Sequence, residues 1–268
     1  MKVVSCFFRL ATALTLAAAA VATAHVPARA EGAAAATPCN APADLVRLTN
    51  PLKRAAQRLA SAHALTIVAI GSSSTAGAGA SSTATTYPSR LEVELKTMFP
   101  AAAITVVNSG VNGEESRDML ARFDRDVIAH NPDLVLWQVG SNSVLRDRPL
   151  AEADAPLHEG IKRLREHGVD LVLMNPQYAP KVFTKHDVDG MVDLINLMAK
   201  KSNVDLFERF AVMRYWRLTE DIPFSTFISP DELHMNDWGY GCLAKLMASA
   251  IGEAATRSTV TATAGTRK

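Results

Sequence analysis

Short apolar runs rich in Val, Ile and Leu alternate along this chain with longer segments of helical periodicity. Runs that are apolar on both faces and separated by helices are typical of a parallel sheet covered on both sides, because parallel strands need crossover connections. The pattern predicts an α/β three-layer sandwich with a five-stranded parallel sheet. We expect strands at 65–70, 103–108, 133–139, 169–174 and 203–207, and helices at 88–98, 114–130, 151–167, 187–201, 208–218 and 237–255.

The N-terminus has the features of an export signal. Lys2 and Arg9 precede an Ala-rich apolar stretch at 10–24, and residues 28–30 (Ala-Arg-Ala) have the small-x-small form of a cleavage site. The stretch is shorter than the roughly 20 residues of a membrane span, so an uncleaved anchor is only the alternative. We expect residues 1–30 to be a cleaved signal peptide, no membrane span in the mature chain, and a periplasmic or secreted protein.

Charge gives no indication of a polyanionic partner. Loss of Lys2, Arg9 and Arg29 with the signal peptide lowers the formal net charge from +1 to −2. A nearly neutral mature chain gives no reason to expect nucleic acid or an anionic membrane as partner. Nothing in the composition indicates an oligomeric state.

The mature chain divides into three parts. Residues 31–62 read as a leader followed by an amphipathic helix, residues 63–256 as one α/β domain, and residues 257–268 as a flexible Thr/Ala-rich tail. Cys39 and Cys242 are the two cysteines that remain after export. In an oxidising compartment such an even pair is more often a bridge than two free thiols, so we expect a disulfide. No Cys/His spacing indicates a metal site, and no cofactor is expected.

Three consecutive predicted strands end in loops rich in Gly, Ser and Asn. The loops are Gly-Ser-Ser-Ser-Thr-Ala-Gly at 71–77, Asn-Ser-Gly-Val-Asn-Gly at 108–113 and Gln-Val-Gly-Ser-Asn at 138–142. Because ligands bind parallel sheets at the carboxyl ends of strands, we expect a site where these loops meet. Further on, Asp231 precedes His234 by three residues, a spacing that lets a carboxylate meet an imidazole across one turn.

These groups predict nucleophilic chemistry. A serine hydroxyl is a poor nucleophile near neutral pH unless a base removes its proton, and an imidazole held by a carboxylate is such a base. A phosphate-binding loop is the competing interpretation of the first loop. The sequence lacks the Gly-Lys-Ser/Thr ending that such a loop carries, so we disfavour it.

The chain resembles the SGNH/GDSL hydrolases over residues 65–252. That family carries a serine after the first strand, a glycine after the second, an asparagine after the third, and Asp-x-x-His near the C-terminus. The resemblance implies a flavodoxin-like SGNH hydrolase fold. It maps the family's groups onto Ser73, Gly110, Asn142, Asp231 and His234.

The resemblance also implies a role for each group. Ser73 would be the nucleophile, His234 the base and Asp231 the carboxylate that orients it. The backbone N–H groups of Ser73 and Gly110 and the side-chain amide of Asn142 would form the oxyanion hole.

Two residues depart from the family's motifs. Ser72 stands where the family has an aspartate before the nucleophile, and Ser143 where it has one after the asparagine. Neither replaced group belongs to the proton-transfer chain, so we expect activity to survive. Ser72 and Ser74 are the rivals of Ser73 for the nucleophile, since an alignment shifted by one residue would select either.

The sequence therefore predicts an exported serine esterase. Its expected substrate is a short-chain acyl ester of a carbohydrate or small molecule, with O-acetyl as the leading candidate. Two alternatives stay open. One is an O-acyltransferase using the same triad, and the other is a catalytically decayed carbohydrate-binding module.

Overall fold

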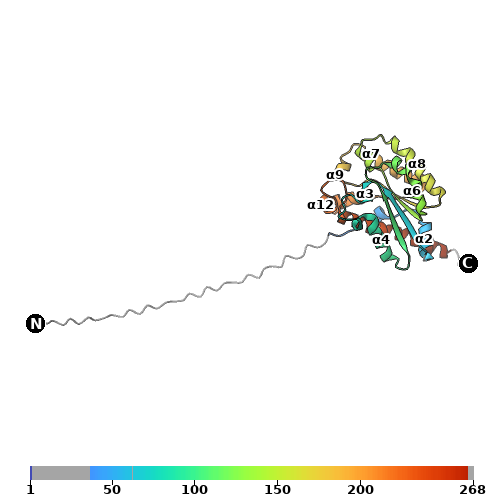
Figure 1. The fold of residues 1–268 in the computed structure, drawn as a ribbon, viewed down its shortest axis with the longest axis horizontal. Helices are drawn as coiled ribbons and strands as arrows, with labels where there is room; N and C mark the ends of the chain where they lie inside the picture. The colour runs from blue at the N-terminus through green and yellow to red at the C-terminus, as the bar shows by residue number, and fades with distance from the viewer. Residues whose placement is uncertain (2–36, 62, 265–268) are drawn as a thin grey trace. The chain divides into compact units, whose positions relative to one another are not determined.

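The computed structural model describes Met1, residues 37–61 and residues 63–264, with residues 258–264 as backbone only. The predicted signal peptide lies outside the described residues apart from Met1. One five-stranded sheet forms the centre of the domain, with strand order β2-β1-β3-β4-β5 and every pair parallel. The strands are β1 Leu65–Gly71, β2 Ile104–Gly110, β3 Leu134–Gln138, β4 Asp170–Met174 and β5 Asp205–Phe207 (Figure 1).

The sheet confirms the predicted fold class. Every residue of β3 is buried, and β1 is buried at all positions except Thr66, as expected for strands covered on both faces. The strand order is the flavodoxin-like order, in which the chain reverses its direction of travel between β1 and β3. Ligand sites in such folds lie at the carboxyl ends of the strands at this switch point.

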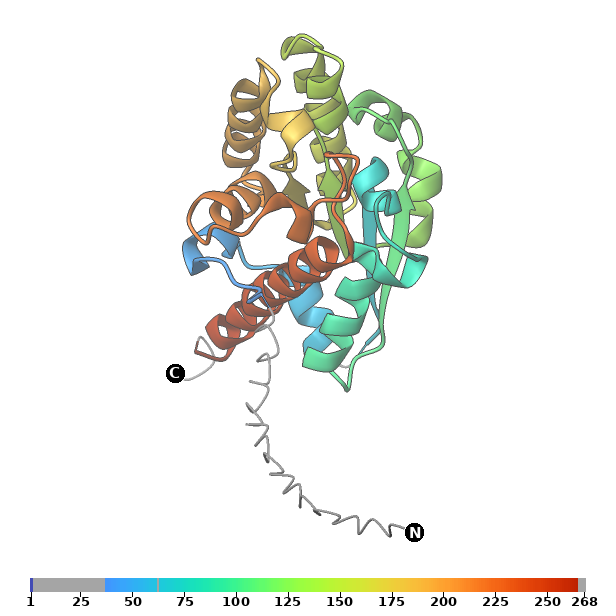
Figure 2. The same cartoon turned by 90° about the vertical axis from the view of Figure 1, so that its left-hand side faces the viewer.

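Helices cover both faces of the sheet, as right-handed crossovers require (Figure 2). On one face α4 (Tyr87–Met98) packs against α13 (Asp237–Ala264); on the other, α8 (Ala151–Glu166) packs against α5 (Ser116–Ala121) and α10 (Val188–Ser202). The shorter helices are α1 Ala43–Val46, α2 Lys53–Ala60, α3 Ser73–Ala76, η1 Thr83–Thr85, α6 Phe123–Asp126, η2 Ile128–His130, α7 Ser141–Leu145, α9 Pro180–Phe183, α11 Arg209–Leu218 and α12 Phe224–Phe227.

The helix predicted over 114–130 is instead three short helices, α5, α6 and η2. Arg122 lies between the first two, and its side chain is nearly buried. Its guanidinium donates to the Ser109 carbonyl at 2.8 Å and pairs with Glu114 at 2.7 Å and Asp126 at 3.0 Å. These bonds tie the segment to the end of β2, so tertiary contacts override the helical periodicity.

The final helix is longer than predicted. The sequence indicated an end near residue 255, whereas α13 continues to Ala264. No glycine or proline interrupts residues 253–264, and Gly265 is the first residue that favours a helix end.

A disulfide joins the N-terminal segment to α13. Cys39 and Cys242 are bonded with a Cα–Cα distance of 5.4 Å across a sequence separation of 203, which confirms the predicted pair. Close by, the indole N–H of Trp216 donates to the Asn40 carbonyl at 2.9 Å. Closing so long a loop stabilises a fold by up to about 5 kcal/mol in the chain-entropy model.

Within the part of the chain that the structure describes, none of the helices has the length and hydrophobicity of a membrane span.

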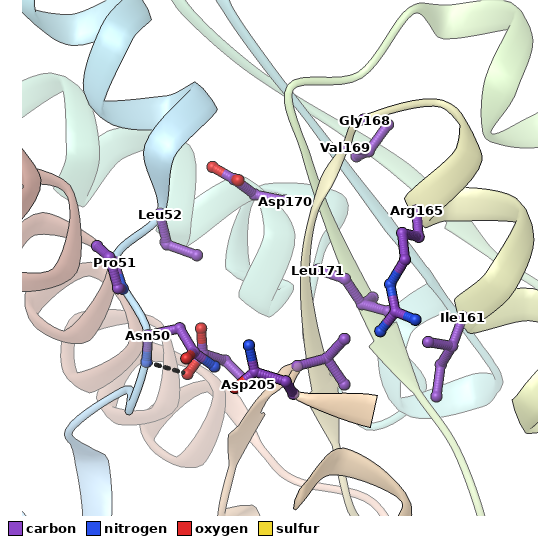
Figure 3. A pocket seen from close by; sticks show the side chains of 12 residues that line it. Asn50, Pro51, Leu52, Ile161, Arg165, Gly168, Val169, Asp170, Leu171 and Asp205 are labelled. Atoms are coloured by element: carbon purple, nitrogen blue, oxygen red, sulfur yellow. Dashed lines mark hydrogen bonds between the residues drawn. The ribbon is translucent and has the colours of Figure 1, made fainter. Parts of the chain in front are cut away.

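Aspartates at the amino edge of the sheet, where the parallel strands begin, bind the segment that leads into β1. Asp170 accepts the backbone N–H groups of Arg54 and Ala55, both at 2.9 Å, and so caps the start of α2 from across the fold. Asp205 accepts the N–H of Asn50 at 2.9 Å. Figure 3 shows Asp170 and Asp205 lining one cavity of about 210 Å³ at this edge.

A third aspartate completes this attachment. Asp133, which directly precedes β3 and is 2 % exposed, accepts the Nε–H groups of Arg54 and Arg58, both at 2.8 Å. Its other oxygen accepts the N–H of Thr66 in β1 at 3.0 Å. The aspartates at the starts of β3, β4 and β5 thus hold residues 50–58 against the sheet.

Burial changes the ionisation of this edge. It raises the pKa of Asp170 to about 6, although the bonds from the Ala55 and Arg54 amides work in the opposite direction. Burial likewise raises the pKa of Asp205. A carboxyl whose pKa is higher in the folded than in the unfolded chain favours folding more as it becomes protonated.

We therefore expect Asp170 to make the fold more stable as pH falls from about 7 to about 4, by roughly 1–3 kcal/mol. The Asp170→Asn variant keeps an oxygen that can accept both amides but cannot titrate. Urea unfolding of both proteins at several pH values gives the difference in free energy of unfolding. The free energy of unfolding of the wild type, relative to that of Asp170→Asn, should increase toward pH 4. If the two proteins instead change in parallel with pH, the raised pKa is not that of Asp170.

Candidate active site

Ser73 lies at the switch point, on the turn that leaves β1. The strand ends at Gly71, and Ser73 is the first residue of the short helix α3. Its backbone N–H therefore has no acceptor within the helix, and no other described residue accepts it. Its hydroxyl Oγ lies 2.7 Å from Nε2 of His234.

His234 comes from the loop that precedes α13, beside α3 in Figure 2. Its Nδ1 lies 2.5 Å from Oδ2 of Asp231, and its side chain is only 14 % exposed. In the tautomer that donates Nδ1–H to this carboxylate, Nε2 is an acceptor for the Ser73 hydroxyl proton. The three side chains thus form one hydrogen-bonded chain.

The loop itself holds Asp231 in place. The other carboxylate oxygen, Oδ1, accepts the Ser229 hydroxyl at 2.7 Å and the backbone N–H groups of Leu233 and His234, both at 2.9 Å. Burial alone would raise the pKa of Asp231, but the hydrogen bonds from His234, Ser229 and Leu233 hold that pKa well below its ordinary value. The group facing His234 is therefore a fixed carboxylate.

The two rival serines lie elsewhere. Ser72 is 2 % exposed, and both its N–H and its Oγ donate to Oε1 of Gln138, at 2.8 and 2.9 Å. Ser74 is 1 % exposed. Of these three serines, the structure brings Ser73 to the imidazole.

Gly110 is held by other contacts. Its N–H donates to Oδ1 of Asn108 at 3.0 Å, so this amide is already engaged. A Cβ at this position would lie 2.1 Å from the backbone nitrogen of Ala76, so glycine is needed here for α3 to pack on the end of β2. These observations give Gly110 a packing role.

Gly113, in the loop after β2, and Asn142, at the start of α7, are brought close by a bond between Asn142 and Glu114. Asn142 Nδ2 donates one hydrogen to the Glu114 carbonyl at 2.9 Å, which leaves its second amide hydrogen available. Gly113 adopts φ +80°, a region that favours glycine, and no described residue accepts its N–H. Arg146 Nη2 donates to the Gly113 carbonyl at 2.8 Å and fixes this turn.

A glutamate contacts Ser143, one of the two serines that depart from the family's motifs. Ser143 donates from Oγ to Glu115 at 3.2 Å, and Glu115 pairs with Arg146 at 2.7 Å and Arg148 at 3.5 Å. The loop after β2 thus supplies a carboxylate beside α7, where the family's motif has its own. Sequence reasoning missed Glu115 and Arg146, because no short motif links residue 115 to residue 146, and it placed Gly113 in a site loop without giving it a role. Among the described residues, no three His, Cys, Asp or Glu side chains form a group that could hold a metal ion.

The fold agrees with comparisons to known proteins. Residues 38–257 match the non-GDSL lipase-like family, and the chain belongs to it. It is 29% identical over 107 residues to an arylesterase from Vibrio mimicus and 35% identical over 94 residues to an acetylxylan esterase from Geobacillus stearothermophilus. Among solved structures, a two-domain esterase active on acetylated mannans superposes with a TM-score of 0.67 at 20% identity, which shows a common fold.

These matches are partial in length. The two curated relatives align with 40% and 31% of this chain, and the chain spans 53% and 43% of their lengths. The structural match covers 79% of this chain and 56% of the two-domain esterase.

The depressed pKa of Asp231 has a consequence for stability. Its contribution is complete above the unfolded value of about 3.9 and is lost as pH falls below that value. The advantage of the wild type over Asp231→Asn in urea unfolding should therefore shrink between about pH 5 and pH 3. Ser229→Ala removes one of the bonds and should lose part of the advantage. A difference that does not change with pH would contradict this account.

Proposed function

We propose that the protein is an exported serine esterase that hydrolyses short-chain acyl esters. Ser73 is the nucleophile, His234 the general base and Asp231 the group that orients the imidazole. The observation that carries the proposal is the continuous chain from Ser73 Oγ to His234 Nε2 at 2.7 Å and from His234 Nδ1 to Asp231 at 2.5 Å. It lies at the ligand-binding edge of the fold.

The reaction has two half-reactions. Ser73 Oγ attacks the ester carbonyl while its proton passes to Nε2 of His234. The tetrahedral oxyanion then collapses, the alcohol leaves with the proton from His234, and an acyl-serine remains. Water, deprotonated by the same imidazole, attacks this ester, and the acid and free Ser73 are released. Asp231 stays ionised throughout and stabilises the imidazolium that forms twice.

Three donors would stabilise the oxyanion. They are the N–H of Ser73 at the start of α3, the N–H of Gly113 and the side-chain amide of Asn142. We propose Gly113 in place of Gly110, because the Gly110 amide already donates to Asn108 while the Gly113 amide has no acceptor among the described residues. Removing one such donor typically costs about 3–4 kcal/mol of transition-state stabilisation.

The substrate class rests on the relatives. One curated relative is an acetylxylan esterase, and the two-domain esterase acts on acetylated mannans. We therefore propose an O-acetylated carbohydrate as substrate. Export is supported by the Cys39–Cys242 disulfide together with the sequence pattern of residues 1–30. An acyltransferase would use the same groups and differ only in the acceptor, a sugar hydroxyl instead of water.

Ser73→Ala should abolish hydrolysis of p-nitrophenyl acetate and labelling by a fluorophosphonate, because among the described residues this is the hydroxyl that is hydrogen-bonded to the imidazole. Ser72→Ala and Ser74→Ala are the matched controls. They remove the same atom one residue away and should still label at residue 73, as peptide mapping would show. Turnover by Ser73→Ala at the wild-type rate would refute the assignment, and a wild type that neither labels nor turns over would favour a binding module.

Asn142→Ala should lower kcat by about a hundredfold or more with little change in KM, since the oxyanion forms only in the transition state. Asn112→Ala, an exposed asparagine in the preceding loop, is the control and should change kcat little. A raised KM at unchanged kcat would place Asn142 in substrate recognition instead.

A further inference from the structure

Arg209, the first residue of α11, is a fully buried cation, 0 % exposed. Its Nε donates to the Asn175 carbonyl at 3.0 Å and its Nη2 to Oε1 of Gln177 at 2.9 Å, while Nη1 has no partner among the described residues. No described carboxylate lies within 4 Å of it. Burial lowers the pKa of Arg209 to about 10, which leaves it charged at neutral pH.

A charge in this position is costly for the fold. Removing a guanidinium from water without a paired anion costs several kcal/mol, and neutral acceptors recover only part of it. Well-packed apolar side chains would usually serve stability better. The position of Arg209 therefore calls for a reason other than stability.

Arg209 determines the orientation of the Gln177 side chain. Oε1 of Gln177 accepts from Arg209 Nη2 and also from the Ser141 hydroxyl at 2.7 Å. Since a guanidinium can only donate, the oxygen of this amide must face Arg209. The amide nitrogen then faces the other way and donates to the Leu233 carbonyl at 3.3 Å. Leu233 immediately precedes His234, so this bond holds the loop that carries the base.

The same network reaches the nucleophile. The Ser141 hydroxyl lies 3.4 Å from Nε2 of Gln138, whose Oε1 accepts both donors of Ser72. Ser72 precedes Ser73, and Ser141 precedes Asn142. One buried set of hydrogen bonds therefore links the three loops that carry the nucleophile, the oxyanion donor and the base. Its members are at most 3 % exposed: Ser72, Gln138, Ser141, Gln177 and Arg209.

We propose that Arg209 and Gln177 are positioning residues, which set the places of Ser73, Asn142 and His234 relative to one another. The proposal rests on the esterase function proposed above. Because the guanidinium of Arg209 can only donate, it keeps the amide oxygen of Gln177 facing it. The amide nitrogen of Gln177 is then free to donate to the Leu233 carbonyl, on the loop that carries His234. The network that contains Arg209 and Gln177 also includes Ser72, which stands where the family's motif has an aspartate.

The Gln177→Glu variant separates positioning from stability. A carboxylate at this site still accepts from Ser141 and gives Arg209 an anion, but it cannot donate to the Leu233 carbonyl. Gln177→Met is the neutral comparison, because it removes both links at similar volume. We expect Gln177→Glu to have a higher urea midpoint than Gln177→Met, yet both should lose about 10- to 100-fold in kcat at nearly unchanged KM.

Rates are expressed per folded molecule, and fluorophosphonate labelling should slow by a similar factor. Asp170→Asn, the reverse exchange at the opposite edge of the sheet, is the control and should keep kcat within about twofold. The proposal is overturned if either Gln177 variant folds and keeps wild-type kcat. If Gln177→Glu does not fold, the kcat of Gln177→Met decides the test. Activity of the wild type and its loss in Ser73→Ala are measured first, so a failure here is distinct from a failure of the esterase proposal.

Discussion

Five parallel strands, of which β1, β3 and β4 are buried along nearly their whole length, leave polar groups two main places to gather: the edge of the sheet where the strands begin and the edge where they end. This chain uses the edges differently. At the amino edge, Asp133, Asp170 and Asp205 bind the segment that enters the sheet. At the carboxyl edge, loops carry Ser73, Asn142 and His234. The apolar centre keeps these edges apart, so attachment and chemistry do not compete for the same side chains.

The ionisation of the carboxyls follows the same division. Asp170 is partly buried and accepts two amides, and no described cationic group lies at hydrogen-bond distance from it, so burial raises its pKa to about 6. Asp231 is more exposed and accepts four hydrogen bonds, so its pKa falls. One group favours folding when protonated and the other when ionised. A single pH dependence of stability for the whole protein would be the sum of such opposing contributions.

Local patterns explain why the sequence predicted what it did. Three features could be predicted from neighbours in the chain or from the compartment: the alternation of apolar strands with helices, the spacing from Asp231 to His234, and the even cysteine pair. All three appear in the structure. The network around Arg209 and Gln177 joins residues 72, 138, 141, 177, 209 and 233, which no spacing relates. Only tertiary packing decides that such polar side chains are buried. The break at Arg122 was missed for the same reason.

The Cys39–Cys242 bond also changes what a cut in the chain would do. All five strands and every described helix before α13 lie between the bonded cysteines. A protease that nicks any surface loop between residues 39 and 242 therefore leaves the two pieces covalently joined. Under oxidising conditions such a molecule migrates as one chain and separates only on reduction, so in a protease-rich compartment a single cleavage does not release a fragment of the sheet.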